Sequence, residues 1–203
     1  MTIQSVIDMA ANGELKNLAV KTDTDAILAY LNLGLIELYK RFPLKTNEYL
    51  VELVEGVDIY TLPSDCMWIV AAYDEVPEDS PDVVSIVAIN EEDNPMSINT
   101  VSWDKIQVPV TLNGAYISII YAAAPDAIDN TMLDEEIDLP PQMLEALLHY
   151  VGYRAHGSVD GNVQAENNTH YQRFEASCNR IEQRGMITSD DLNMYARNMK
   201  GFV

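Results

Sequence analysis

The sequence feature that most constrains the fold is the apolar stripe of one long helix near the start of the chain. Apolar side chains recur at helical spacing from residue 27 to residue 42, after Thr22-Asp23-Thr24, whose hydroxyl and carboxylate groups can cap a helix start, and before the helix-ending Pro43. An amphipathic helix cannot bury its own stripe, so other segments must supply apolar faces that cover it. The stripe consists of Ile27, Leu31, Leu35, Leu38 and Phe42, with Leu28 and Tyr39 beside them.

Three further segments show the same helical spacing of apolar residues. They span residues 2–11, residues 140–157 and about residues 162–184. A proline pair suits the start of the second segment, because proline lacks the amide that would have no partner in a first helical turn. We therefore expect a bundle of three to four helices, built from residues 1–44 and 139–184.

The middle of the chain changes to the alternating pattern of β-strands. Strands are expected at residues 49–53, 57–62, 68–73, 83–89, 108–112 and 115–121. Two of the connections predict β-hairpins, one turning at Gly56 and the other at Asn113-Gly114, a pair that supplies the positive φ angles of a two-residue turn. Residues 45–138 are therefore predicted to form an antiparallel β module.

The predicted fold class is α+β: a helical bundle with the β module inserted at residues 45–138 and an extended C-terminal tail at residues 185–203. The tail has too few large apolar side chains for a core of its own and too many for an indifferent linker. Either it folds back on its own bundle or it becomes ordered on docking into a partner, and we favour the partner. These apolar residues are Met186, Leu192, Met194, Tyr195, Met199 and Phe202.

The net charge of −20 comes from 32 acidic and 12 basic residues, and it is concentrated in one part of the chain. Residues 45–139 hold 20 acidic residues against Lys45 and Lys105 alone. A protein that holds nucleic acid needs clustered basic side chains to replace the counterions of the phosphates, so ordinary nucleic-acid binding is excluded. A negative surface still allows DNA to pass without being held.

The chain carries none of the motifs that mark common active sites. It lacks a nucleophile elbow, a phosphate-binding loop and a dinucleotide fingerprint. Cys66 and Cys178 lie among apolar neighbours, which is typical of packing thiols and not of nucleophiles. We therefore predict no catalytic residue, no cofactor and no enzymatic activity. A hydrolase built from carboxylates that no motif marks is the enzymatic alternative.

The three histidines are the residues that most resemble metal ligands. His149 and His156 share one side of a predicted helix with Glu145, and His170 lies on the next helix. Two antiparallel helices could bring these residues together at a metal ion. Neither a His-Glu-x-x-His motif nor paired cysteines support such a site, so we interpret them as surface or interface histidines and predict no metal site.

The acidic clusters and the apolar runs exclude two further roles. The clusters at residues 74–82, 91–93 and 134–138 lack the alternating ligands and central glycine of a calcium loop, so they are interpreted as solvated loop charge. The longest apolar run, residues 115–124, is far shorter than the roughly 20 residues that cross a bilayer, so we predict no membrane association.

Four segments occur in an order that is similar to that of a known protein family. They are Thr24–Asn32 continuing to Phe42, Tyr60–Asp65, Ile137–Tyr150 followed by Tyr153-Arg154-Ala155, and the helix bearing Tyr171, Phe174 and Arg180. In this order and spacing the chain resembles the head-to-tail adaptor proteins of tailed bacteriophages, also called connector or head completion proteins, which form the ring next to the portal. The resemblance covers residues 1–184.

The resemblance implies a structural protein of the virion, assembled in the host cytoplasm and placed at the junction of head and tail. It implies a ring of about twelve subunits that docks under the portal, extends the DNA channel and offers a platform to a tail or nozzle protein. DNA would be a partner only in passage. The resemblance also implies a C-terminal extension that reaches into the portal. We expect its anchors to be Leu192, Met194, Tyr195, Met199 and Phe202.

Two alternatives of a non-enzymatic kind stay open. The first keeps the virion but places the chain in another neck or tail-completion ring. The second is an acidic protein that mimics DNA and inhibits a host enzyme acting on nucleic acid; it requires surface carboxylates at regular spacing on a small monomer.

Overall fold

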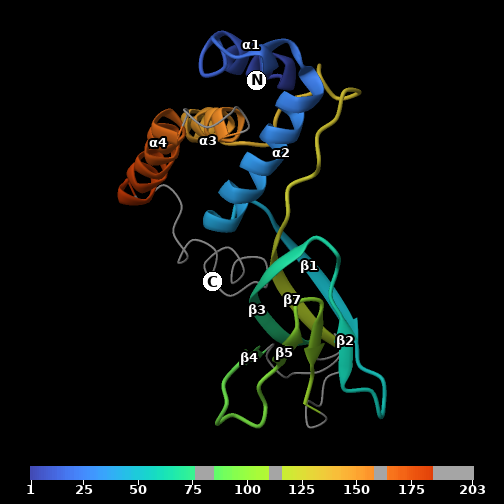
Figure 1. The fold of residues 1–203 in the computed structure, drawn as a ribbon. Helices are drawn as coiled ribbons and strands as arrows, with labels where there is room; N and C mark the ends of the chain where they lie inside the picture. Colours follow the sequence, from blue (N-terminus) through green and yellow to red (C-terminus); the bar gives the residue numbers. More distant parts are fainter. Residues whose placement is uncertain (76–84, 110–115, 158–163, 185–203) are drawn as a thin grey trace. The chain divides into compact units, whose positions relative to one another are not determined.

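The computed structural model describes residues 1–75, 85–109, 116–157 and 164–184 (Figure 1). Its contacts divide these residues into two compact units. The helical unit is built from residues 1–42 and 125–184, and the β unit from residues 43–124. The described residues contain four α-helices and two small antiparallel sheets, which confirms the predicted α+β class.

The helical unit contains all four α-helices. They are α1 (Ile3–Asn12), α2 (Thr24–Arg41), α3 (Leu144–Gly157) and α4 (Gln164–Gln183), with two short 3-10 turns, η1 (Ala19–Thr22) and η2 (Pro141–Met143). The helix starts follow from local chemistry. The Thr2 hydroxyl accepts from the Ser5 amide at the start of α1, and the Asp23 carboxylate accepts from the Ala26 amide at the start of α2.

The predicted stripe of α2 forms the centre of the helical core. All seven of its residues are buried, which confirms the interpretation of residues 24–42. Gly34 lies on this buried face, where α2 approaches α3 closely. A Cβ atom at Gly34 would lie 2.6 Å from Leu147 Cδ1 and 3.2 Å from Tyr150 Cδ1, so the packing of these two helices depends on the absence of a side chain there.

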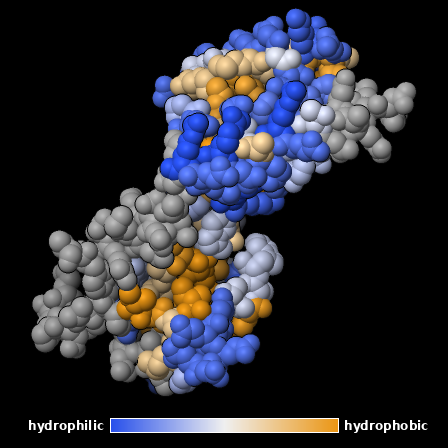
Figure 2. Space-filling view, turned by 90° about the vertical axis from the view of Figure 1, so that its left-hand side faces the viewer, coloured by the Kyte–Doolittle hydropathy of each residue, from blue (hydrophilic) through white to orange (hydrophobic). Residues whose placement is uncertain are grey.

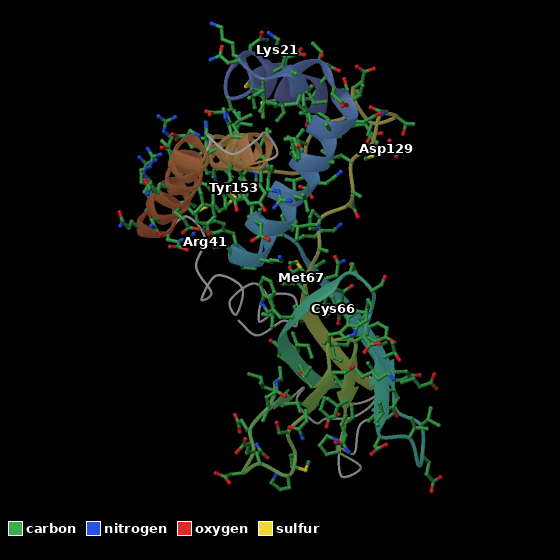
Figure 3. The ribbon with its side chains drawn as sticks, viewed as in Figure 1. Lys21, Arg41, Cys66, Met67, Asp129 and Tyr153 are labelled. Carbon is green, nitrogen blue, oxygen red and sulfur yellow. The ribbon has the colours of Figure 1, made fainter. Side chains whose placement is uncertain are left out.

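Arg41, at the C-terminal end of α2, connects that helix to α4 (Figure 3). Its guanidinium Nε donates to Glu182 Oε1 at 2.7 Å, and Nη1 donates to Glu175 Oε2 at 2.8 Å. Nη2 donates to Asn179 Oδ1 at 2.7 Å. One arginine thus satisfies three side chains on successive turns of α4, and its hydrogen bond lowers the pKa of Glu182.

Residues 125–138, which we had placed in the β insertion, hydrogen-bond to the helices. The Asn32 side chain of α2 both donates to and accepts from the backbone of Ile128, at 2.8 and 2.9 Å. The Ile3 amide donates to the Glu135 carbonyl at 2.9 Å, and the Tyr39 hydroxyl donates to the Asp138 carbonyl at 2.8 Å. This segment is therefore part of the helical unit in its contacts.

The β unit consists of a four-stranded and a three-stranded sheet, both antiparallel. The first has the order β1 (Thr46–Glu52), β7 (Tyr116–Ala123), β3 (Cys66–Glu75) and β4 (Ser85–Val87). The second has the order β2 (Ile59–Thr61), β6 (Lys105–Gln107) and β5 (Asn99–Ser102). Apolar side chains from both sheets share one core, which includes Val51, Ile106 and Ile117.

Predicted strands coincide with β1, β2, β3, β4 and β7, whereas β5 and β6 are not among the predicted strands. The predicted hairpin at Gly56 is wrong, and the predicted hairpin at Asn113-Gly114 includes residues 110–115, which lie outside the described residues. β1 pairs with β7, with Val51 opposite Ile117, whereas β2 pairs with β6 in the other sheet. β7 is bordered by β1 on one side and β3 on the other. Strand pairing is a non-local choice, and the turn residue Gly56, with φ 81°, joins strands of different sheets.

Candidate functional site

The predicted anchor residues of the tail all lie outside the described residues. Leu192, Met194, Tyr195, Met199 and Phe202 belong to residues 185–203. Their assignment to a partner interface therefore stays a prediction.

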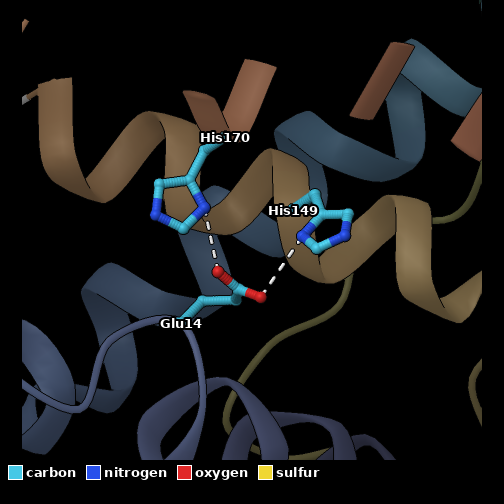
Figure 4. A group of neighbouring side chains, drawn as sticks. All are labelled: Glu14, His149 and His170. Atoms are coloured by element: carbon cyan, nitrogen blue, oxygen red, sulfur yellow. Dashed lines mark ion pairs between the residues drawn. The ribbon is translucent and has the colours of Figure 1, made fainter. Parts of the chain in front are cut away.

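The helical unit brings one carboxylate and two imidazoles together (Figure 4). Glu14 comes from the turn after α1, His149 from α3 and His170 from α4. His149 Nδ1 lies 3.2 Å from Glu14 Oε1, and His170 Nδ1 lies 2.9 Å from Glu14 Oε2. One ligand atom from each of the three residues lies within 4.8 Å of the other two, so together they could hold a metal ion.

These three residues form the Glu14 cluster, and all of them are largely withdrawn from solvent. The side chains of Glu14, His149 and His170 are 20%, 13% and 12% exposed. Contact with the His149 ring, followed by contact with the His170 ring, holds the pKa of Glu14 well below its usual range, although burial opposes this shift. The carboxylate of the Glu14 cluster is therefore an anion at neutral pH.

His156 lies beside the Glu14 cluster and contacts both Glu14 and His170. Its ring is stacked on His170 with centroids 4.6 Å apart, and its Nε2 lies 3.2 Å from the backbone carbonyl of Glu14. Because a carbonyl can only accept, Nε2 carries the proton and donates. Gly152 of α3 lies under His170, and a Cβ atom there would be 2.8 Å from His170 Nδ1. The position of the His170 ring is therefore set by Gly152 and His156, which pack against it.

Glu145 lies on the other side of His149. Its Oε1 is 3.6 Å from His149 Nε2 and accepts from Arg180 Nη2 at 3.0 Å. The predicted proximity of His149 and Glu145 on one helix is thus present. The histidines were interpreted as surface or interface residues; a surface position is wrong for all three, because they are largely buried, including His156 at 7% exposed.

A cavity of about 320 Å³ adjoins the Glu14 cluster and is open to solvent. Glu14 and His170 line it, together with Asn17, Thr169 and Arg173. The cavity gives solvent and small ions access to the carboxylate. Arg173 is an exposed residue on this wall.

Sequence reasoning named both cluster histidines but missed Glu14. Glu14 lies in a turn 135 residues before His149, and the sequence places no histidine or cysteine at helical spacing from it. The only sequence signal at this position was a lone acidic residue directly after the Asn12-Gly13 helix end. Such a residue is common in exposed turns, so nothing local distinguished it.

The two cysteines behave as packing thiols. Both are free, and burial raises the pKa of Cys66 and of Cys178 to about 11. At neutral pH they are protonated and therefore poor nucleophiles.

The β unit exposes both apolar and acidic side chains. Figure 2 shows apolar side chains gathered on the visible face of this unit. Trp103 is its most exposed large apolar residue at 79%. The acidic residues Glu91, Glu92 and Asp93 are all exposed, in agreement with solvated loop charge. No helix among the described residues has the length and apolar character needed to cross a membrane.

Comparison with known proteins places the chain in a family. The model of the SU10 adaptor protein family matches residues 1–198. This chain therefore belongs to the SU10 adaptor protein family. An adaptor joins other components, so the family assigns a structural role and not a catalytic one.

Two further comparisons add no evidence for the family assignment. A search of curated proteins found no match. Among solved structures, the chain is similar to one described as the neck of an empty GTA particle computed with C6 symmetry, with 17% identity over 68% of this chain and 69% of that chain. Its TM-score of 0.28 is too low to establish a shared fold, so the family assignment rests on the sequence match.

Proposed function

We propose that this protein is the head-to-tail adaptor of a tailed bacteriophage. Its subunits form a ring that docks under the portal, extends the DNA channel and offers an attachment platform to the tail. The observation that carries the proposal is the adaptor family match over residues 1–198, nearly the whole chain. The order of the four sequence segments quoted above agrees with this proposal.

The charge of the chain supports a channel role. Residues 43–124 hold 14 acidic residues and two basic ones. A surface of this sign repels phosphates, so a genome could slide past it without being held. A channel lined with lysine and arginine would instead bind the moving DNA and slow it.

The ring also requires a particular kind of contact between subunits. A closed ring is built from one head-to-tail interface, in which two different faces of the same subunit meet. By resemblance to the bacteriophage adaptors, we propose a ring of about twelve subunits. Native mass spectrometry and negative-stain images of the protein, alone and with the portal protein of the same virus, test this directly.

The expected result is a ring on the portal whose axis coincides with the portal channel. A protein that stays monomeric and does not bind the portal contradicts the proposal. Binding to the tail but not to the portal would place the chain in a lower ring instead.

Substitutions in the C-terminal tail test the proposed anchor to the portal. We propose that Leu192, Met194, Tyr195, Met199 and Phe202 insert into the portal, so a variant with all five changed to serine should fold normally and no longer bind it. A matched control changes polar residues of the same tail, Asn193→Ala and Asn198→Ala, and should bind as the unmodified chain does. Equal portal binding by the serine variant would remove the tail from the interface.

A further inference from the structure

We propose that Glu14, His149 and His170 form a binding site for a transition metal ion of the zinc type. The bound ion would tie the turn after α1 to helices α3 and α4. This inference does not depend on the proposed adaptor function, because it rests on contacts within the helical unit alone.

The donor atoms lie close enough together to converge on one small ion, since one ligand atom from each residue is within 4.8 Å of the other two. Zinc binds nitrogen and carboxylate oxygen at 2.0–2.2 Å, so two of its ligands lie about 3.3 Å apart in a tetrahedral site. In the Glu14 cluster His149 Nδ1 lies 3.2 Å from Oε1 and His170 Nδ1 lies 2.9 Å from Oε2, so each nitrogen faces a different oxygen of the same carboxylate. A modest movement of the two rings would open the space for an ion between them.

The ring nitrogens themselves are the second observation. Nδ1 of His149 and Nδ1 of His170 are both buried; each lies within ion-pair distance of the Glu14 carboxylate, but within the described parts of the chain neither makes a hydrogen bond of regular geometry. A buried polar atom without such a partner is costly, and nearly all buried polar atoms in proteins avoid that state. Coordination of an ion would satisfy both nitrogens at once.

The surroundings resemble the outer shell of a metal site. A histidine that binds a metal usually has a carboxylate or carbonyl near its other ring nitrogen, which fixes the orientation of the ring. Glu145 Oε1 takes that position at His149, 3.6 Å from Nε2. For His170 the orientation is set by packing, with Gly152 on one side and the stacked His156 ring on another.

The donor set indicates which ions would bind. Two imidazoles and one carboxylate suit zinc and its neighbours in the first transition row. Magnesium and calcium take oxygen ligands almost entirely and in greater number, so they should not bind here. The open cavity of about 320 Å³ gives access to the site and room for a water molecule as a fourth ligand.

The test uses the full-length chain, freed of metal by dialysis against a chelator. We expect one equivalent of Zn²⁺ to bind per chain in isothermal titration. At a free Zn²⁺ concentration 100 times its Kd, the unfolding equilibrium constant should fall by about 100-fold. Mg²⁺ at the same concentration serves as the control for general attraction to an acidic protein and should stabilise the chain much less.

The variants Glu14→Gln and His170→Gln should weaken Zn²⁺ binding by more than about 100-fold, which exceeds the usual effect of an outer-shell change. The matched control Glu92→Gln removes an exposed carboxylate of the β unit and should leave Zn²⁺ binding unchanged. Circular dichroism checks that each variant is folded. The proposal is overturned if Glu14→Gln binds Zn²⁺ as the unmodified chain does, or if Mg²⁺ stabilises the chain equally.

A second measurement needs no variant. Co²⁺ in a tetrahedral site absorbs visible light far more strongly than Co²⁺ in water, so it can replace Zn²⁺ as a spectroscopic probe. We expect one equivalent of Co²⁺ to produce this absorption and added Zn²⁺ to abolish it. If Co²⁺ gives no such band with the unmodified chain, the Glu14 cluster is an ion pair of a carboxylate with two imidazoles and not a metal site.

Discussion

Substitution of Gly34 by alanine tests the close packing of α2 on α3. The new Cβ atom would lie 2.6 Å from Leu147 Cδ1, about 1 Å inside normal contact, and 3.2 Å from Tyr150 Cδ1. Leu147 is fully buried and cannot turn toward solvent. Overpacking of this kind costs about 1–3 kcal/mol, and the higher helix propensity of alanine returns about 1 kcal/mol. We expect a net loss of about 0–2 kcal/mol in the free energy of unfolding.

The assay must measure unfolding of the helical unit separately from unfolding of the β unit. Both tryptophans, Trp68 and Trp103, belong to the β unit, so denaturant unfolding should be followed by far-ultraviolet circular dichroism for the helices and by fluorescence for the β unit. Leu147→Ala alone should cost about 2–5 kcal/mol. In that background the alanine at position 34 has space and should cost nothing or stabilise. A Gly34→Ala cost that is the same with and without Leu147 would refute the reasoning.

Two other changes test the charges and the thiols. Arg41→Met should lower the stability of the helical unit by about 1–2 kcal/mol, because it removes a three-way contact with α4. Arg41 lowers the pKa of Glu182, so its contribution is present above the ordinary glutamate pKa of about 4.3 and should shrink as the pH falls below it, which unfolding curves at pH 7 and pH 3.5 would show. Cys66 and Cys178, each with a pKa of about 11, should react slowly with a thiol reagent at pH 8 in the folded protein and rapidly in denaturant; fast labelling of the native chain would contradict their burial.

The helices could be predicted from sequence because their determinants are local. The stripe of α2, its capping segment Thr22-Asp23-Thr24 and its end before Pro43 all lie within about twenty residues, and the structure reproduces them, with Asp23 as the cap. The strand β7 was equally clear, because an apolar run of this length that is too short for a membrane predicts a buried strand.

Strand partners could not be predicted, because the pairing choice is made between segments far apart in the chain. The alternation of β1 is that of a half-buried strand, but it does not say that residue 51 lies opposite residue 117. The Glu14 cluster could not be predicted for the same reason, because its residues are far apart in the sequence. Its two histidines were visible on adjacent helices, but the carboxylate comes from a turn that only the packing of α1 brings to them.

The order of the two units along the chain has a consequence for synthesis on the ribosome. The described residues of the β unit all fall between residues 43 and 124, so this unit can close as soon as that part of the chain has emerged. The helical unit is interrupted in sequence by the β unit. The apolar face of α2 is therefore covered only after α3 and α4, more than a hundred residues later, have been synthesised. During that interval the nascent protein carries a helix, N-terminal to the β unit, whose apolar face is not yet covered by α3 and α4, and this is the stage at which a chaperone would be most useful.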